Sequence, residues 1–301
     1  MKILRNNGQF EVYNEDCQQA IRNLPDASID CILTDPPYLF LKKHRLERAF
    51  DERSVFTEFS RVLKPKGFVI LFGRGTSFYR WNTILAELGF EFKEEVIWDK
   101  GNSTSPLMRM ARIHETISLH SKSGVIHRVK VPYLEMREYH IERIISDVKI
   151  LMSAFSNSKS FKAVHDFLEN NRINNGPIIR TDRFETVKIT KHQTSIANSP
   201  KSANRCANVV QAMEFGLTEK SIIKQVRDHY TAIHPTQKPV KLLERLLKIV
   251  TSTNDLVLDP FAGSCSTGIA CLNTNRRFVG YEIDREYYEA GISRLLCEGS
   301  I

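Results

Sequence analysis

Two loops near opposite ends of the chain, each beginning with aspartate after an apolar run, most strongly constrain the fold. The run Ile29–Thr34 leads into Asp35-Pro36-Pro37-Tyr38, and Leu256–Leu258 leads into the loop Asp259–Gly268. Short apolar runs that end in proline or glycine turns are typical of buried parallel strands. The carboxyl ends of such strands meet at one edge of an α/β sheet, where ligands bind. We therefore expect both loops at one site.

The residue types of the first loop suit an amino group on a flat ring. The Asp35 carboxylate can accept a hydrogen bond, and the rigid prolines hold the Pro36 carbonyl as a second acceptor. Tyr38 offers a ring face for stacking. These are the requirements of a nucleobase turned out of its helix.

The second loop suits a nucleotide-like cofactor. It precedes a predicted helix, whose first N–H groups are free to bind a ligand. Cys265 stands where a second glycine is common. Glu282, after the strand Phe278–Tyr281, is placed to bind two ribose hydroxyls, whereas Asp284 is expected to cap the next helix.

Three motifs in order, Asp35–Tyr38, His234–Pro239 and Asp259–Gly263, resemble those of DNA amino-methyltransferases that use S-adenosylmethionine, in their permuted β class. The resemblance implies an α/β, Rossmann-like methyltransferase fold: a mainly parallel, twisted sheet with helices on both faces and a circularly permuted motif order. It also implies a catalytic half (1–120), an inserted target-recognition region (121–232) and a cofactor-binding half (233–301).

The same resemblance assigns further site residues. It places Asp16 and Cys17 at the adenine side of the cofactor, and Thr236, Lys238 and Pro239 at its methionine side. As alternatives, Asp16 caps a helix over 17–24 and Lys238 is a surface lysine. The complete cofactor set adds the loop and the following strand: Asp259, Phe261, Ala262, Gly263 and Glu282. His114-Glu115 resembles a family segment near the base or the backbone, although a structural role is as well supported.

The net charge of +8 is concentrated in the middle of the chain. Residues 121–230 hold 18 Lys and Arg against 11 Asp and Glu, so they carry +7 of the total. Such an excess favours a phosphate-facing surface on double-stranded DNA, and ordinary solvated lysines are the alternative. The predicted DNA contacts are all basic: Lys42, Lys43, Arg45, Arg48, Arg109 and Arg112.

The predicted reaction is direct methyl transfer from S-adenosylmethionine to adenine N6. Cytosine-N4 is the main alternative, since the chemistry is the same; in the resembling families Asp at position 35 favours adenine and Ser more often favours cytosine. A catalytically silent DNA-binding protein is a second alternative. RNA or protein acceptors are disfavoured, because the related protein-modifying families usually carry Asn at the position of Asp35. Cytosine-C5 methylation is disfavoured because the chain contains no Pro-Cys pair.

Length and composition limit the possible domain organisation, metal content and location of the protein. The 301 residues can form one large α/β domain with an insertion. The six cysteines form no C-x-x-C pair and no zinc-like cluster, so we expect free thiols and no metal. No leader and no run of about 18 apolar residues appears, so we expect a cytoplasmic protein, bacterial or phage-encoded. A homodimer is considered because members of the resembling class often dimerise.

Apolar periodicity predicts the remaining elements. Strands are expected near 11–14, 68–72, 92–98 and 116–120. Helices are expected near 54–63, 78–88, 141–155, 161–168 and 239–250, and from about 267. Residues 170–205 are rich in polar residues and are expected to be mostly loop.

Overall fold

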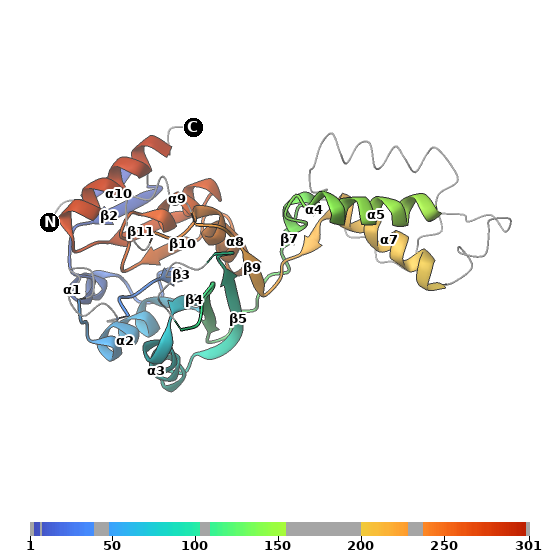
Figure 1. Cartoon of the computed structure of the whole chain (residues 1–301). Helices are drawn as coiled ribbons and strands as arrows, with labels where there is room; N and C mark the ends of the chain where they lie inside the picture. The colour runs from blue at the N-terminus through green and yellow to red at the C-terminus, as the bar shows by residue number, and fades with distance from the viewer. Residues whose placement is uncertain are drawn as a thin grey trace. The chain divides into compact units, whose positions relative to one another are not determined.

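The computed structural model describes residues 3–6, 8–38, 48–102, 109–154, 200–227 and 237–298. The chain forms two compact units: residues 1–127 together with 220–301, and residues 128–219. The larger unit therefore combines segments from both ends of the chain (Figure 1). Residues 220–227 belong to it, although they fall within the range 121–232 expected as an insertion.

The larger unit is built around a nine-stranded sheet of described residues. Its strands, in spatial order, are β1 (Ile3–Asn6), β2 (Phe10–Tyr13), β11 (Arg277–Tyr281), β10 (Leu256–Asp259), β3 (Ile29–Thr34), β4 (Leu63–Gly73), β6 (His114–Ser121), β5 (Glu91–Asp99) and β9 (Ile222–Lys224). The five strands from β2 to β4 in this order pair in parallel, whereas β6 is antiparallel to both neighbours.

Helices lie on both faces of this sheet. The helical segments of the larger unit are α1 (Cys17–Ala20), the 3₁₀ turn η1 (Ile21–Asn23), α2 (Glu52–Val62), α3 (Gly75–Glu87), α8 (Val240–Val250), α9 (Ser266–Asn273) and α10 (Arg285–Glu298). The mainly parallel α/β fold expected from the motifs is confirmed.

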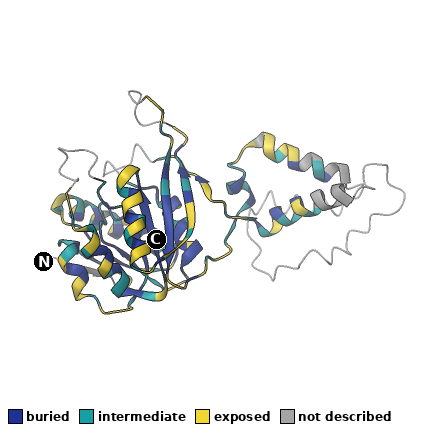
Figure 2. Ribbon diagram, turned by 90° about the horizontal axis from the view of Figure 1, so that it is seen from below, coloured by how far each residue is buried: buried dark blue, intermediate teal, exposed yellow. Residues whose placement is uncertain are grey.

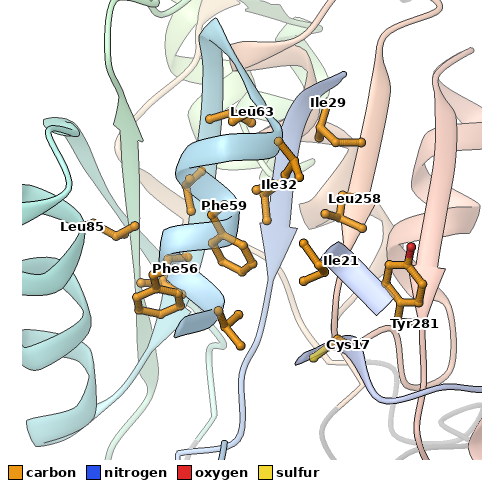
Figure 3. Close-up of a cluster of buried hydrophobic side chains, with 14 of the residues drawn as sticks. Cys17, Ile21, Ile29, Ile32, Phe56, Phe59, Leu63, Leu85, Leu258 and Tyr281 are labelled. Atoms are coloured by element: carbon orange, nitrogen blue, oxygen red, sulfur yellow. The ribbon is translucent and has the colours of Figure 1, made fainter. Parts of the chain in front are cut away.

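Alternate residues of the strands face the two helical layers, because side chains alternate along a strand. On one face, Leu258 of β10 joins a buried cluster with Phe59 of α2 (Figure 3). Val279 of β11 belongs to the same cluster. On the other face, the neighbouring Phe278 lies against α9, where a Cβ added at Gly268 would come within 2.8 Å of its ring. The central strands are therefore buried from both sides (Figure 2).

Two expectations differ from the structure. Strand β4 begins before the strand expected near 68–72. Its residues 64–67 bulge out of the ladder, because the pairing passes from Ile29 with Leu63 to Cys31 with Phe68. Residues 200–205, expected as loop, begin helix α7 (Pro200–Phe215). Proline is favourable in a first helical turn, so the polar composition there was misleading. The helix expected at 161–168 lies outside the described residues.

The smaller unit contains α4 (Tyr133–Met136), α5 (Ile141–Ala154), α7 and the short strands β7 (Lys130–Val131) and β8 (Leu217–Thr218). The helix expected at 141–155 is confirmed as α5. Leu151 of α5 packs with Val209 and Met213 of α7 around Tyr133.

We expect Leu258→Ala to destabilise the larger unit by about 2–5 kcal/mol, because Leu258 is fully buried at the centre of the sheet. The control Ile222→Ala, at a side chain that is 60% exposed, should cost less than about 0.5 kcal/mol. Urea unfolding followed by tryptophan fluorescence reports this unit, since the two tryptophans, Trp81 and Trp98, are buried within it. Equal losses in both variants would contradict the central role of β10.

Candidate active site

Three acidic residues stand at the carboxyl ends of adjacent parallel strands. Asp35 follows β3, Asp259 ends β10 and Glu282 follows β11. They line one cavity of about 350 Å³, within the range of about 300–1,000 Å³ that is usual for small-ligand sites. The cavity brings together most of the predicted site residues: Asp16, Cys17, Asp35, Pro36, Pro37, Tyr38, Arg48, Lys238, Asp259, Phe261, Ala262, Gly263 and Glu282.

Both carboxylate oxygens of Asp35 have partners. The Tyr38 hydroxyl donates to Oδ1, and the Lys238 ammonium donates to Oδ2 over 2.5 Å. Burial raises the pKa of Asp35, while the positive charge of Lys238 acts in the opposite direction. A fifth of the side chain stays exposed. Asp35 is thus a deep carboxylate that still reaches the cavity.

Tyr38 is held at the edge of the apolar core. Its ring centroid lies 5.8 Å from that of Trp81, and its backbone carbonyl accepts a hydrogen bond of 3.2 Å from Ser77 Oγ. Burial also raises the pKa of the Tyr38 hydroxyl well above its usual value. The hydroxyl is therefore a neutral donor to Asp35 at physiological pH.

The glycine loop is braced from within by Asp259. Its Oδ1 accepts from the backbone N–H of Phe261 (3.1 Å) and its Oδ2 from the Thr267 hydroxyl (2.6 Å). Burial raises the pKa of Asp259 to about 7. Asp259 is only 4% exposed, so the loop's shape depends on it directly.

Cys265 adopts a left-handed backbone conformation, with φ of +56°, at the start of α9. This conformation is costly for residues with a Cβ and is the reason that glycine is common at such positions. The side chain is fully buried, and its Sγ would lie 2.7 Å from a Cβ added at Gly291. The departure from glycine is thus accommodated by packing against α10.

Glu282 and Asp16 both bind backbone N–H groups. Glu282 accepts from Gly263 and Asp284, each over 2.8 Å, and burial raises its pKa. Asp16 caps α1 by accepting from the Gln18 N–H over 2.9 Å, so its capping role is confirmed while it also lines the cavity. Asp284 Oδ1 accepts from the N–H groups of Glu286 and Tyr287, as expected of a helix cap.

Lys238 is not a surface lysine. Only 8% of its side chain is exposed, and its Nζ lies between Asp35 and Glu115, at 2.5 and 3.1 Å. Pro239 is the N-cap of α8 and Thr236 lies outside the described residues. Burial lowers the pKa of Lys238, but the two carboxylates outweigh it and the net direction is upward.

Glu115 gathers two further cations that the sequence did not single out. Its Oε1 binds Lys100 Nζ at 3.2 Å and Arg227 at 2.7 Å. Despite burial, the three cations lower the pKa of Glu115 to about 2. Lys100 follows β5 and Arg227 follows β9, so their approach depends on strand pairing. No local sequence signal marks either residue.

The predicted DNA contacts are placed only in part. Arg48 is exposed beside the cavity, Arg109 is exposed and Arg112 is partly exposed ahead of β6. Lys42, Lys43 and Arg45 lie outside the described residues.

The described part of the chain contains neither a candidate metal cluster nor a candidate membrane span. No group of three or more His, Cys, Asp or Glu side chains is arranged to hold a metal ion there. None of the helices described is long and apolar enough to cross a membrane.

Comparisons with known proteins agree with the family that the motifs resemble. A family model described as DNA methylase, N6_N4_Mtase, matches residues 29–293. The type II methyltransferase M.BglII of Bacillus subtilis is 24% identical over 296 residues, covering 93% of this chain and 67% of that protein. The DNA adenine methyltransferase YhdJ of Escherichia coli K12 is 44% identical over 73 residues, 24% of each chain.

Solved structures share the fold. The crystal structure of the M1.HpyAVI–SAM complex has a TM-score of 0.55 at 21% identity, covering 95% of this chain and 98% of that one. The cytosine-N4-specific PvuII DNA methyltransferase has a TM-score of 0.54 at 14% identity, covering 95% and 86%.

We expect Asp259→Asn to change how stability depends on pH. The folded-state pKa of about 7 lies above the ordinary 3.8, so the folded wild type loses stability as pH rises from about 4 to 7. Asparagine cannot ionise; its amide oxygen can still accept from the Phe261 N–H, and its NH2 group can donate to the Thr267 hydroxyl oxygen. The variant should therefore gain on the wild type over this range by about 1.4 kcal/mol per unit of pKa difference. Urea unfolding without ligand measures this, and a pH-independent difference would contradict it.

A pair of substitutions tests the backbone strain at Cys265. Cys265→Gly and Cys265→Ala both remove the sulfur, but only glycine removes the Cβ that disfavours a φ of +56°. We expect the glycine variant to be about 1 kcal/mol more stable than the alanine variant. Thermal unfolding of the two proteins compares them, and equal stability would show that the position is unstrained.

Proposed function

This chain belongs to the family of DNA methylases, and we propose that it transfers a methyl group from S-adenosylmethionine to adenine N6 in double-stranded DNA. The observation that carries the proposal is the position of Asp35. Its carboxylate lies at the end of β3, opens onto the cavity, and stands beside a tyrosine ring and two rigid prolines. A target base flipped from the duplex would meet acceptor and stacking groups together.

S-adenosylmethionine is the methyl donor of this family, and the groups that line the cavity fit it. Each Glu282 oxygen accepts one backbone N–H, which leaves further lone pairs for ribose hydroxyls. Asp16, Phe261 and Gly263 line the same cavity beside it. We propose that these residues hold the nucleoside part of the cofactor.

The chain's own residues prepare the amine. When bound, S-adenosylmethionine supplies a methyl group that is attached to a cationic sulfonium sulfur, and this sulfur leaves as a neutral thioether. Asp35 and the Pro36 carbonyl accept the two hydrogens of N6, which draws the nitrogen toward tetrahedral geometry and localises its lone pair. Tyr38 stacks on the base. As the N–CH₃ bond forms, N6 loses one proton to the Asp35 carboxylate, and placement and electrostatics supply most of the rate.

Cytosine-N4 is the second candidate, favoured by one observation. PvuII DNA methyltransferase, which shares the fold, is cytosine-N4-specific, and the matching family model includes both N6 and N4 in its name. Adenine is supported by Asp at position 35 and by the likeness to a DNA adenine methyltransferase. Both bases present an exocyclic amine, so the identity of the methylated product distinguishes the two candidates.

We propose that DNA is bound by basic residues of the larger unit, among them Arg48 at the cavity, and by the smaller unit. Arg48, Arg109 and Arg112 would contact phosphates, together with Lys42, Lys43 and Arg45 of the adjoining segment. The excess positive charge of residues 121–230 supports target recognition by the smaller unit. We also propose that the protein binds DNA as a homodimer.

The proposal is tested by incubating the purified chain with labelled S-adenosylmethionine and double-stranded genomic DNA. Nucleoside digestion and mass spectrometry then identify the product. We expect N6-methyladenine. N4-methylcytosine would establish the second candidate, and absence of any methylated base would overturn both.

We expect Asp35→Ala to lower the single-turnover methylation rate by about 100-fold or more, because the amine loses its main acceptor. Cofactor affinity should change by less than about threefold, since Asp35 binds the base rather than the nucleoside. The control Glu95→Ala removes an exposed carboxylate from β5 and should leave both quantities unchanged. Near-normal turnover of Asp35→Ala would refute the role given to Asp35.

A further inference from the structure

Lys238 links Asp35 to a second buried carboxylate. Its Nζ donates to Asp35 Oδ2 over 2.5 Å and lies 3.1 Å from Glu115 Oε2. Two aromatic rings flank the ammonium, with centroids 5.1 Å (Phe72) and 5.9 Å (Trp98) away. An ammonium held by two carboxylates and two ring faces has little freedom to turn elsewhere.

Glu115 is itself fixed from the opposite side. Lys100 and Arg227 bind its Oε1, so the carboxylate is tied to β5 and β9 as well as to its own strand β6. Among the described residues in direct contact, three cations meet two carboxylates. This excess of positive charge opposes the cost of burying an ionised Asp35.

The two oxygens of Asp35 therefore differ. Oδ2 accepts from a buried ammonium that Glu115 anchors, whereas Oδ1 accepts from the neutral hydroxyl of Tyr38. Tyr38 and Asp35 both line the cavity, and a carboxylate oxygen that accepts one hydrogen bond keeps a second lone pair for a donor that enters it. Oδ1 is then the oxygen that an incoming amine can reach.

We propose that Lys238, anchored by Glu115, is a positioning residue that holds Asp35 Oδ2 and reserves Oδ1 for the amino group of the target base. The identity of that amine rests on the proposed function. The resemblance of the motif implied a cofactor contact for Lys238, and the geometry points to Asp35 instead. Lys238 touches the acceptor carboxylate, not the reacting atoms.

Removing Lys238 has a predictable electrostatic effect. Without the ammonium, burial and the charge of Glu115 raise the pKa of Asp35 against the Tyr38 hydrogen bond alone, so the carboxyl should take up its proton at higher pH. Methyl transfer needs the ionised Asp35 carboxylate. In a variant without Lys238, the rate should therefore begin to rise at a higher pH than in the wild type. Among the described residues, the charged or titratable groups facing Asp35 are Lys238, Tyr38, Glu115, Asp259 and, behind Glu115, Lys100 and Arg227.

The test measures Asp35 ionisation independently of activity. Carboxyl ¹³C NMR of aspartate-labelled full-length protein, with the Asp35 signal assigned by Asp35→Asn, gives its titration midpoint. We expect Lys238→Gln to raise the midpoint by about one pH unit or more, and Lys238→Arg to restore it in large part. Lys100→Gln removes the same charge from Glu115 without touching Asp35, and should shift the midpoint less than Lys238→Gln does.

Activity and binding complete the test. With Lys238→Gln, the single-turnover rate at pH 7 should fall about tenfold or more, and the acid limb of its pH profile should move upward with the NMR midpoint. Cofactor affinity, measured by calorimetry, should stay within about threefold of the wild type. Glu115→Gln should lower the single-turnover rate although Lys238 keeps its charge, because the contact that anchors the Lys238 ammonium is weakened.

Two results would overturn the inference. One is an unmoved Asp35 midpoint in Lys238→Gln while the protein keeps its tryptophan fluorescence. The other is a loss of cofactor affinity above about tenfold with no change in the acid limb, which would make Lys238 a cofactor ligand. A wild type that forms no methylated base would refute the proposed function instead, and the NMR midpoints would still decide the role of Lys238.

Discussion

The parallel pairing of β3 with β10 is the contact on which the rest of the molecule depends. It joins the N-terminal and C-terminal segments, with Val257 opposite Cys31 and Leu258 opposite Ile32. At the amino end of these strands, Asp30 accepts from the Leu256 N–H and from Lys64, which ties β3 to both neighbours. Because the strands run in one direction, this single pairing places Asp35 and Asp259 at the same edge.

Local sequence was sufficient wherever one strand and its following loop define a residue's position. Asp35, Asp259 and Glu282 each end or follow an apolar run, so their common edge could be predicted. The cap formed by Asp16 is equally local. Methyl transfer was then predicted from the motifs, and the family match agrees with it.

The remaining features arise from contacts between distant segments. Lys238 was identified by its motif, but its partner Glu115 lies on β6, and only the folded sheet brings them together. Arg227 reaches Glu115 because the three-residue strand β9 extends the sheet beside β5. So short a strand has too little pattern to be predicted. The charged network behind Asp35 was therefore invisible to periodicity and composition.

The division of the sheet between the two ends of the chain has a consequence for synthesis on the ribosome. When β3 and β4 leave the exit tunnel, the neighbour of β3 on its other side has not yet been made, and the smaller unit emerges before it. Pairing across such a sequence separation carries a high loop-closure cost and is slow to form. Until β10 arrives, the edge of β3 is an unpaired apolar strand, the kind of surface on which nascent chains associate wrongly and chaperones act.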